Sequence, residues 1–430
     1  MKSVVAQFGS FARPIQLLAL NQLTINIGFY MLMPYLANYL AGDLGLAVWL
    51  VGLILGIRNF SQQGMFLVGG SLADRWGYKP MILTGLVLRT LGFALLGLVT
   101  SVPALIVASA LIGLAGALFN PAARAYLAQE AGERRVDAFA LFNVFYQAGI
   151  VIGPLIGLAL GGIAFQLTCA VAAGVFALLA LAQLRALPAR AGSNADAGHS
   201  ILTDWRHALS NRGFLFFSLA MIGSYVLNFQ VYLGLPIEVR RLTSSQLGVT
   251  LLFLVSGLLA ILGQLRITAW AKARWTPAQA ITRGLALMGL AFLPLALTAH
   301  LDPTPHGPPT PLAYALTLAP VLLSTALLTV ATLVVYPFEM ATIITLGGQR
   351  MVGTYYGLYS TLTGIGIAVG NLLTGAALDA GRVLGIPSLP WIALAATGAA
   401  CALAVHTLHR TEHLDPPQSD LTPTQPSQRS

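Results

Sequence analysis

The sequence predicts an all-α integral membrane protein with twelve transmembrane helices in two pseudo-symmetric six-helix bundles. Only 9% of the 430 residues are charged and 57% are hydrophobic, whereas a soluble chain carries about 25% charged residues. Apolar runs of about 20 residues, the length that crosses a bilayer core, recur from Pro14 to His409. A set of positions also repeats between the two halves of the chain, which suggests duplicated bundles.

The apolar runs are expected to form helices. Irregular backbone cannot face lipid, and barrel strands are alternating segments of about 10 residues, shorter and less continuously apolar than these runs. The first run continues past residue 30 without a small-residue cleavage site, so we expect an uncleaved first span and no signal peptide. The predicted helices span residues 15–40, 46–70, 80–100, 103–126, 136–163, 165–187, 213–236, 246–268, 278–299, 311–336, 353–378 and 389–409.

The formal net charge of +9 comes mainly from short loops between the predicted helices. Short loops rich in Lys and Arg usually stay on the cytoplasmic side, so the distribution of these residues among the loops predicts the orientation of the chain. We expect a multi-pass protein of the inner (plasma) membrane with both termini cytoplasmic, and no nucleic-acid partner. This orientation leaves only Arg240, Arg241 and Arg382 outside. The residues inside are Lys2, Arg13, Arg75, Lys79, Arg124, Arg134, Arg135, Arg185, Arg190, Arg206, Arg212, Lys272, Arg274, Arg350, Arg410 and Arg429.

The chain divides near its middle at residues 188–212, the longest polar interruption between the first and last predicted helices. This segment is expected to be a cytoplasmic linker. It separates an N-terminal six-helix bundle, residues 1–187, from a C-terminal six-helix bundle, residues 213–412. Residues 413–430 are rich in Pro, Ser, Thr and Gln and are expected to form a disordered cytoplasmic tail.

The two halves resemble divergent copies of each other. Three positions of the first predicted helix recur 202 residues later in the seventh, where Asn228, Tyr232 and Pro236 match Asn26, Tyr30 and Pro34. At an offset of 216, Pro337 and Arg350 match Pro121 and Arg134. Halves of this kind, related by an axis along the membrane normal, place a substrate site near the midplane between them.

A segment with glycines, an acid and bases lies between the second and third predicted helices, and it consists of Gly70, Asp74, Arg75, Gly77 and Lys79. We expect Gly70 to let neighbouring helices approach closely and Gly77 to turn the chain. Asp74 is expected to pair with cationic groups or a helix N-terminus at the cytoplasmic face. The segment resembles the signature loop of the major facilitator superfamily, which implies a gating role. The alternative is an ordinary basic cytoplasmic loop.

Predicted helix five carries Gly149, Gly153 and Gly157 at intervals of four residues, together with Pro154. Small residues at this spacing make a flat helix face, and proline removes one backbone donor and bends the helix. The pattern resembles the motif that marks antiporters, which are exporters, in the same superfamily. Ordinary helix packing is the alternative, because glycines spaced by four are common in membrane helices.

Polar side chains inside the spans are candidates for a transport cavity, because an ionised side chain at the bilayer centre costs about 2.5–3.5 kcal/mol on insertion scales. They occur mainly four residues apart on helices one, two, five, seven and eleven, so each pair shares a helix face. Interhelical hydrogen bonds are the alternative role for each pair, and we expect Arg89 in helix three to have a structural role. The candidate cavity residues are Asn26, Tyr30, Arg58, Gln62, Asn143, Gln147, Asn228, Tyr232, Tyr355 and Tyr359.

A proton-coupled transporter needs a group whose protonation changes during the cycle, and burial moves the pKa of a carboxyl group toward neutrality. Glu339, near the cytoplasmic end of helix ten, and Asp74 are the candidate proton sites. An ion pair with Arg350 is the alternative role of Glu339, and gating is the favoured role of Asp74. Neither a metal-binding cluster nor a phosphate-binding glycine loop occurs in the sequence. We therefore expect no enzyme and no cofactor, and a proton gradient as the energy source.

The whole chain resembles the drug:proton antiporters of the major facilitator superfamily, and most of all the MdtH type of multidrug exporter. The segments from Arg58 to Gly64 and from Met81 to Gly85, beside the loop motif, carry this resemblance. It implies proton-coupled export of amphipathic, drug-like compounds by alternating access. Ser109 stands where many such antiporters have an arginine, so the proton-relay role of that arginine is not carried over.

The partners expected of the chain are the lipid bilayer, a small-molecule substrate and protons, and we expect a monomer. A dedicated exporter of a single metabolite and a non-transporting membrane sensor are the alternative functions. The second half of the chain contains only a degenerate copy of the loop motif, from Gly263 to Trp275, and this copy has no acidic residue at the position that matches Asp74.

Overall fold

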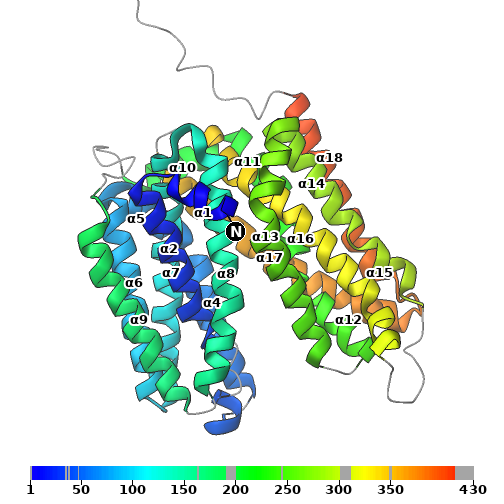
Figure 1. The fold of residues 1–430 in the computed structure, drawn as a ribbon, viewed down its shortest axis with the longest axis horizontal. Coiled ribbons are helices and arrows are strands. Elements are labelled where there is room, and N and C mark those ends of the chain that lie inside the picture. The colour runs from blue at the N-terminus through cyan, green and yellow to red at the C-terminus, as the bar shows by residue number, and fades with distance from the viewer. Residues whose placement is uncertain are drawn as a thin grey trace, which may run out of the picture.

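The computed structural model describes residues 2–33, 36, 39–46, 48–161, 164–189, 200–243, 246–300, 311–347 and 351–411. This part of the chain is helical, contains no strand, and forms two bundles that stand side by side (Figure 1). The N-terminal bundle contains α1 (Lys2–Gly9), α2 (Arg13–Tyr30), α4 (Val48–Gly64), α5 (Phe66–Trp76), α6 (Tyr78–Leu98), α7 (Val102–Ala131), α8 (Arg135–Gly161) and α9 (Phe165–Ala186). The C-terminal bundle contains α11 (Arg212–Phe229), α12 (Gly234–Thr243), α13 (Gln246–Arg274), α14 (Pro277–Leu290), α15 (Leu293–Thr298), α16 (Pro311–Gly347), α17 (Val352–Val383) and α18 (Leu389–Arg410).

Nine helical segments of the described chain are long and apolar enough to cross a membrane, and one of them, Val102–Gly157, holds both α7 and α8. The predicted spans 15–40 and 46–70 are interrupted helices. In the first, α2 ends at Tyr30, and in the second a break at Met65 separates α4 from α5. Counted with these two, the described part of the chain accounts for the predicted twelve transmembrane helices in two six-helix bundles.

Many large apolar side chains are exposed on the molecule, among them Leu98, Leu178, Leu297 and Leu372. In water, extended apolar surface of this kind would drive association. Against lipid tails it needs no further cover, because the surroundings are equally apolar. The exposed leucines therefore fit a chain surrounded by the hydrocarbon of a bilayer.

The two bundles pair their helices in the same way. In the N-terminal bundle α2 packs on α8, α4 on α7, and α6 on α9. In the C-terminal bundle α11 packs on α17, α13 on α16, and α14 on α18. When the spans of each bundle are numbered from one to six, span one packs on span five, span two on span four, and span three on span six in both bundles. The pseudo-symmetry predicted from the repeated positions is thus present in the packing.

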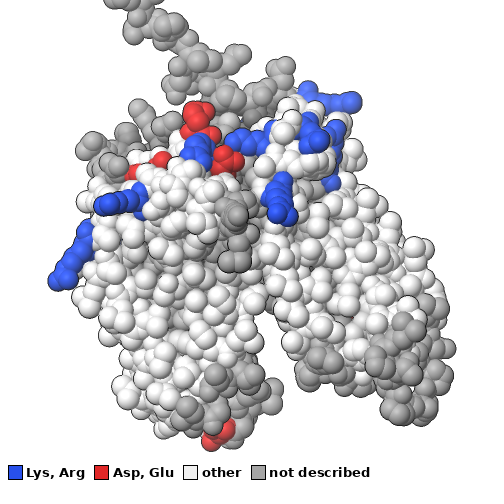
Figure 2. Space-filling view, in the orientation of Figure 1, with Lys and Arg blue, Asp and Glu red and all other residues white. Residues whose placement is uncertain are grey.

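The bundles touch at one end of the molecule and part at the other. α5 packs on α17 and α8 packs on α13, at the end near which α1, α10 (Ile201–Ser210) and the last turns of α18 also lie (Figure 1). We call this the closed end. At the opposite end, the open end, Figure 2 shows a cleft between the bundles. The Lys and Arg side chains visible in that view gather at the closed end, as expected if the basic loops share one side of a membrane.

The segment between the bundles is partly helical, although the sequence predicted only a polar linker. Ser200 caps α10 by accepting a hydrogen bond from the backbone N–H of Thr203 at 3.2 Å, which is a common way to begin a helix. Asp204 and Ala208, four residues apart on α10, are buried, so one face of this helix packs on the protein. Residues 190–199 and the predicted tail 413–430 lie outside the described part of the chain.

Candidate functional site

Asp74 joins the two bundles at the closed end. Its carboxylate is 1% exposed and accepts hydrogen bonds from the backbone N–H groups of Gly353 at 2.7 Å and Thr354 at 2.6 Å, and from Thr354 Oγ1 at 2.7 Å. Both N–H groups belong to the first turn of α17, where backbone donors lack intrahelical partners and the helix dipole favours an anion. An aspartate of the N-terminal bundle therefore caps a helix of the C-terminal bundle.

Two glycines let α5 and α17 approach closely enough for this contact. A Cβ at Gly70 would lie 2.0 Å from the carbonyl oxygen of Gly353, and a Cβ at Gly353 would lie 2.5 Å from that of Gly70. Since both obstacles are backbone atoms, a larger residue at either position would push the helices apart. The close approach expected of Gly70 is thus present, and it occurs across the bundle interface.

The expectation that the motif forms a loop was wrong. α5 continues through Asp74 and Arg75 to Trp76, because no residue before Gly77 interrupts the helix. Gly77 alone makes the turn, with φ of 93° and ψ of 155°, a backbone region that is essentially restricted to glycine.

The two basic residues of the motif bind neighbouring helices. Arg75 pairs with Asp204 of α10, with Nη2 2.5 Å and Nε 3.2 Å from Oδ2. Lys79 Nζ donates to the carbonyl oxygen of Leu184 at 2.8 Å, near the C-terminal end of α9, where backbone acceptors are unpaired. A second bond fixes α10, because Trp205 Nε1 donates to Ser71 Oγ at 2.7 Å. The helix between the bundles is therefore held against α5.

A buried amide pair makes a further contact between the bundles. Asn143 Nδ2 of α8 donates to Gln264 Oε1 of α13 at 2.6 Å. Gln264 Nε2 in turn donates to Thr268 Oγ1 and to the carbonyl oxygen of Leu333, both at 2.9 Å. About two turns further along the same two helices, Lys272 Nζ lies 3.0 Å from Asp137 Oδ2. The α8–α13 contact thus combines a buried amide network with a more exposed ion pair.

The glycines of α8 pack this helix on α2 within the N-terminal bundle. A Cβ at Gly149 would lie 2.5 Å from Asn26 Cβ, and a Cβ at Gly153 would lie 2.8 Å from Tyr30 Cβ. Gly157 is buried, and α8 remains helical through Pro154. Close helix packing, the alternative to an antiporter motif, accounts for the positions of Gly149 and Gly153.

A polar and aromatic group of residues lies between the bundles, and we call it the cleft group: Tyr30, Arg58, Gln62 and Tyr232. Arg58 is half-buried, stacks 5.0 Å from the ring centroid of Phe29, and donates through Nη2 to Gln62 Oε1 at 3.3 Å. Tyr30 is close enough to interact electrostatically with Arg58 and also with Tyr232 of the C-terminal bundle. The Tyr232 side chain is 49% exposed. The structure therefore brings these four predicted cavity residues together from both bundles.

Four other predicted cavity residues form contacts between helices, which was the stated alternative. Asn143 bonds to Gln264, as described above. Asn26 Nδ2 donates to the carbonyl oxygen of Tyr146 at 3.3 Å, and Asn228 Oδ1 accepts from Thr332 Oγ1 at 3.3 Å. Tyr355 is buried, and its hydroxyl accepts from Asn211 Nδ2 at 3.3 Å. Gln147 is half-buried. Spacing by four shows that two residues share a helix face but not which neighbour that face meets, so the sequence could not separate these helix contacts from a place in the cavity.

Arg89 is enclosed by aromatic rings inside the N-terminal bundle. It is 5% exposed, and its guanidinium carbon lies 5.6–5.9 Å from the ring centroids of Phe29, Phe119 and Phe176. Rings around a cation supply favourable electrostatic contact without a counter-ion. This setting agrees with the structural role expected for Arg89.

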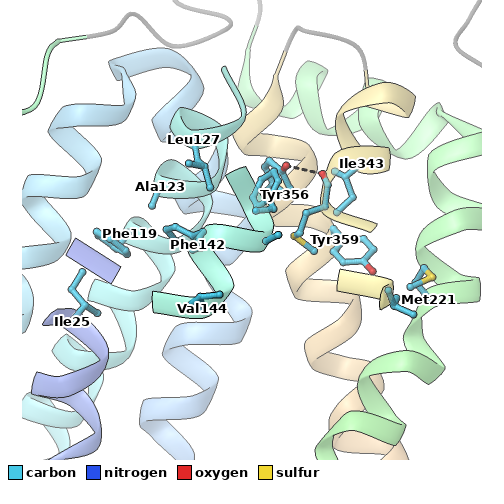
Figure 3. Packing of buried hydrophobic residues seen from close by; sticks show 14 of the residues in the cluster. Ile25, Phe119, Ala123, Leu127, Phe142, Val144, Met221, Ile343, Tyr356 and Tyr359 are labelled. Atoms are coloured by element: carbon cyan, nitrogen blue, oxygen red, sulfur yellow. Dashed lines mark hydrogen bonds between the residues drawn. The ribbon is translucent and has the colours of Figure 1, made fainter. Parts of the chain in front are cut away.

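Glu339 is buried between helices in the C-terminal bundle. It is 3% exposed, and its carboxylate accepts a hydrogen bond from the hydroxyl of Tyr359, with Tyr225 as a second hydrogen-bonding partner. Figure 3 shows Tyr359 among the packed apolar residues of this region. Arg124 of α7, in the other bundle, lies near enough to attract the carboxylate. The proposed partner Arg350 lies outside the described residues.

Arg124 itself crosses the bundle interface. Its Nη1 donates to Ser360 Oγ of α17 at 3.1 Å, and it also bonds to Tyr336 of α16. Arg124 was predicted to be one of the basic loop charges, although it falls inside the predicted span 103–126. That position inside a span was the signal that could have identified it, as it was for Gln264. Nothing in the sequence pattern pointed to Asp204.

The family model described as Major Facilitator Superfamily matches residues 18–371 of the chain. The chain belongs to the major facilitator superfamily. Its similar relatives include an uncharacterized MFS-type transporter of Mycobacterium tuberculosis, 50% identical over 395 residues, which cover 91% of this chain and 92% of the relative. They also include the multidrug resistance protein MdtH of Photorhabdus laumondii, 31% identical over 409 residues, which cover 95% and 96% of the two chains. This superfamily member is thus a transporter, not an enzyme.

Solved structures of the superfamily share the fold. The MFS transporter FucP in the outward conformation superposes with a TM-score of 0.70 at 16% identity, over 92% of this chain and 98% of that one. The human organic anion transporter MFSD10 (TETRAN) gives a TM-score of 0.65 at 17% identity, over 91% and 99%. These likenesses confirm the predicted architecture.

Proposed function

We propose that this superfamily member is a proton-coupled exporter of small amphipathic compounds in the inner (plasma) membrane, working by alternating access. The relatives named multidrug resistance protein MdtH support drug-like substrates. The cleft group supports adaptable recognition, because tyrosines and amides offer both apolar surface and hydrogen bonds. The closed end is proposed to face the cytoplasm, since the basic loops gather there.

The setting of Glu339 carries the proposal of proton coupling. An ionised Glu339 attracts Arg124 of the other bundle, and that attraction favours the arrangement in which the closed end is shut. A proton on Glu339 removes the attraction and so lowers the stability of the shut arrangement. A ligand shifts a conformational equilibrium by its difference in affinity for the two states, and here the proton is that ligand.

The contacts of the closed end suit an interface that opens and shuts. Asp74 binds α17 through hydrogen bonds, and Asn143 binds Gln264 through an amide pair, so separation exposes groups that water can satisfy. Large apolar interfaces would resist such exposure. The proposed cycle alternates between the arrangement with a cleft at the open end and one in which Asp74 and Asn143 have released their partners.

The test is efflux from cells and everted vesicles with and without the protein, across a panel of dyes and antibiotics, with an uncoupler. Glu339→Gln keeps the size and the hydrogen-bond acceptor of the side chain but removes the titrating group. We expect broad, uncoupler-sensitive efflux that is lost in Glu339→Gln at unchanged amounts of folded protein.

A matched control is Glu238→Gln, which removes another buried glutamate, paired with Arg241 at 2.6 Å in α12. Gradient-dependent efflux should persist in that variant. Full coupling in Glu339→Gln would contradict the role of Glu339, and uncoupler-insensitive efflux by the unmodified protein would contradict proton coupling. Transport of a single metabolite would favour the dedicated exporter, and no transport at all would favour the sensor.

A further inference from the structure

A groove lies on the C-terminal bundle where α13, α14 and α16 meet, toward the closed end. Its volume is about 400 Å³, within the range of about 300–1,000 Å³ typical of small-molecule sites. The floor is apolar and includes Ile267, Leu287 and Val334, while Arg266, Trp270 and Trp275 line the rest. A floor of this kind suits a hydrocarbon chain.

One arginine, Arg266, lines the groove, and two more, Arg274 and Arg283, stack on tryptophans that line it. Arg266, Arg274 and Arg283 are exposed, and none of them forms an ion pair with a described carboxylate. Arg274 stacks 5.2 Å from the ring centroid of Trp270, and Arg283 stacks 4.9 Å from that of Trp275. The two indoles pack edge to face at 4.6 Å. The rings hold the guanidinium groups of Arg274 and Arg283 in place, and no carboxylate in the described part of the chain neutralises their positive charge.

The groove lies near the turn that joins two membrane-spanning helices at the closed end. α13 ends at Arg274 and α14 begins at Pro277, so Arg274 lies at this turn, while Arg266 and Arg283 lie about two helical turns away along α13 and α14. Tryptophan is enriched at the membrane–water interface, and basic pockets between spanning helices there bind anionic headgroups. We propose that this groove binds an anionic phospholipid of the leaflet at the closed end, with its phosphate among Arg266, Arg274 and Arg283 and an acyl chain along the apolar floor.

The same turns of α13 also carry the contact between the bundles. Gln264, Thr268 and Lys272 face that contact, and Arg266, Trp270 and Arg274 follow each of them by two residues. Two residues turn an α-helix by about 200°, so the two sets occupy opposite faces. A lipid in the groove therefore contacts the helix segment whose opposite face closes the transporter.

The test is quenching of tryptophan fluorescence in the full chain reconstituted in phosphatidylcholine vesicles. One preparation contains brominated phosphatidylglycerol, and the other contains the same mole fraction of brominated phosphatidylcholine. We expect stronger quenching by the brominated phosphatidylglycerol. The excess should disappear when Trp270 and Trp275 are replaced by Phe, because the quenched rings lie in the groove.

The charge dependence is tested with Arg266→Gln, Arg274→Gln and Arg283→Gln, singly and together. Each removal should weaken the preference for phosphatidylglycerol about fivefold. The control is a triple variant of equal net charge, with Arg185, Arg206 and Arg410 replaced by Gln, all exposed and outside the groove. It should keep the preference, and both triple variants should be monodisperse with unchanged helix content.

Three results would overturn the proposal. The first is equal quenching by the two brominated lipids, and the second is an equal loss in the groove triple variant and its control. The third is displacement of the brominated phosphatidylglycerol by dissolved inorganic phosphate, which would identify a site for free anions instead. If the arginine triple variant fails to fold, the single variants replace it, because each of them should weaken the preference for phosphatidylglycerol about fivefold.

Discussion

Replacing Asp74 with Asn should shift the protein away from the arrangement with the shut closed end. Both carboxylate oxygens of Asp74 accept backbone N–H groups at the start of α17, one from Gly353 and one from Thr354. Asn has one acceptor oxygen, and its NH₂ group would meet a second donor. In the variant, one of the two hydrogen bonds therefore becomes a neutral hydrogen bond, and the other is lost.

The size of the shift follows from these contacts. A hydrogen bond to a charged group contributes about 1.5–3 kcal/mol and a neutral one about 0.5–1.5 kcal/mol, so losing one charged bond and neutralising the other removes about 2.5–4.5 kcal/mol of the stability of the shut closed end. A change of about 1.4 kcal/mol alters an equilibrium constant tenfold, so the balance should move by about two to three powers of ten. A transporter held mostly in one arrangement cannot complete its cycle, and efflux should fall to a few per cent or less.

Distances between spin labels at Gln129 and Thr345 would measure this shift, because both side chains are exposed and they belong to α7 and α16 of different bundles. We expect a new population at longer distance in Asp74→Asn. Asp379→Asn is the control, since Asp379 is exposed and lies 3.5 Å from Arg382, away from the bundle interface. An unchanged distance distribution together with wild-type efflux would refute the assignment of Asp74 as a link between the bundles.

The other predictions concern the second contact, the cleft and the topology. Asn143→Leu leaves Gln264 buried without its partner, which should destabilise the shut closed end by about 1–3 kcal/mol and lengthen the same label distance; an unchanged distance would contradict this. Arg58→Ala should change substrate preference or the pH profile of efflux per folded molecule, with partial rescue by Arg58→Lys, whereas a merely structural Arg58 would lower only the amount of folded protein. Reporter fusions within 190–199 and after residue 412 should both report a cytoplasmic location, and a periplasmic signal at either would overturn the proposed orientation.

At the closed end, some features of the Gly70–Lys79 segment could be predicted from the sequence and others could not. The residue types and spacing from Gly70 to Lys79 predicted close helix approach, a chain turn, and an acid that pairs with cationic groups or a helix N-terminus. The structure contains the close approach and the turn, and of the two partners of the acid it contains the helix N-terminus. The partner helix could not be predicted, because Gly353 lies 279 residues from Asp74 and belongs to the other bundle. The helical state of the motif was missed for a simpler reason, since charged residues were taken to mark a loop.

The sequence by itself determined the membrane environment, the twelve spans and the division into halves, because each depends on local hydrophobic length and on charge between spans. Only the tertiary structure decided how the helices are rotated and which bundle faces touch. This packing places Glu339 near Arg124, and it brings Asn143 to Gln264 and Tyr355 to Asn211. A polar side chain inside a membrane helix predicts that a hydrogen-bond partner exists. The identity of that partner depends on packing between helices that are distant along the chain, which no local sequence pattern encodes.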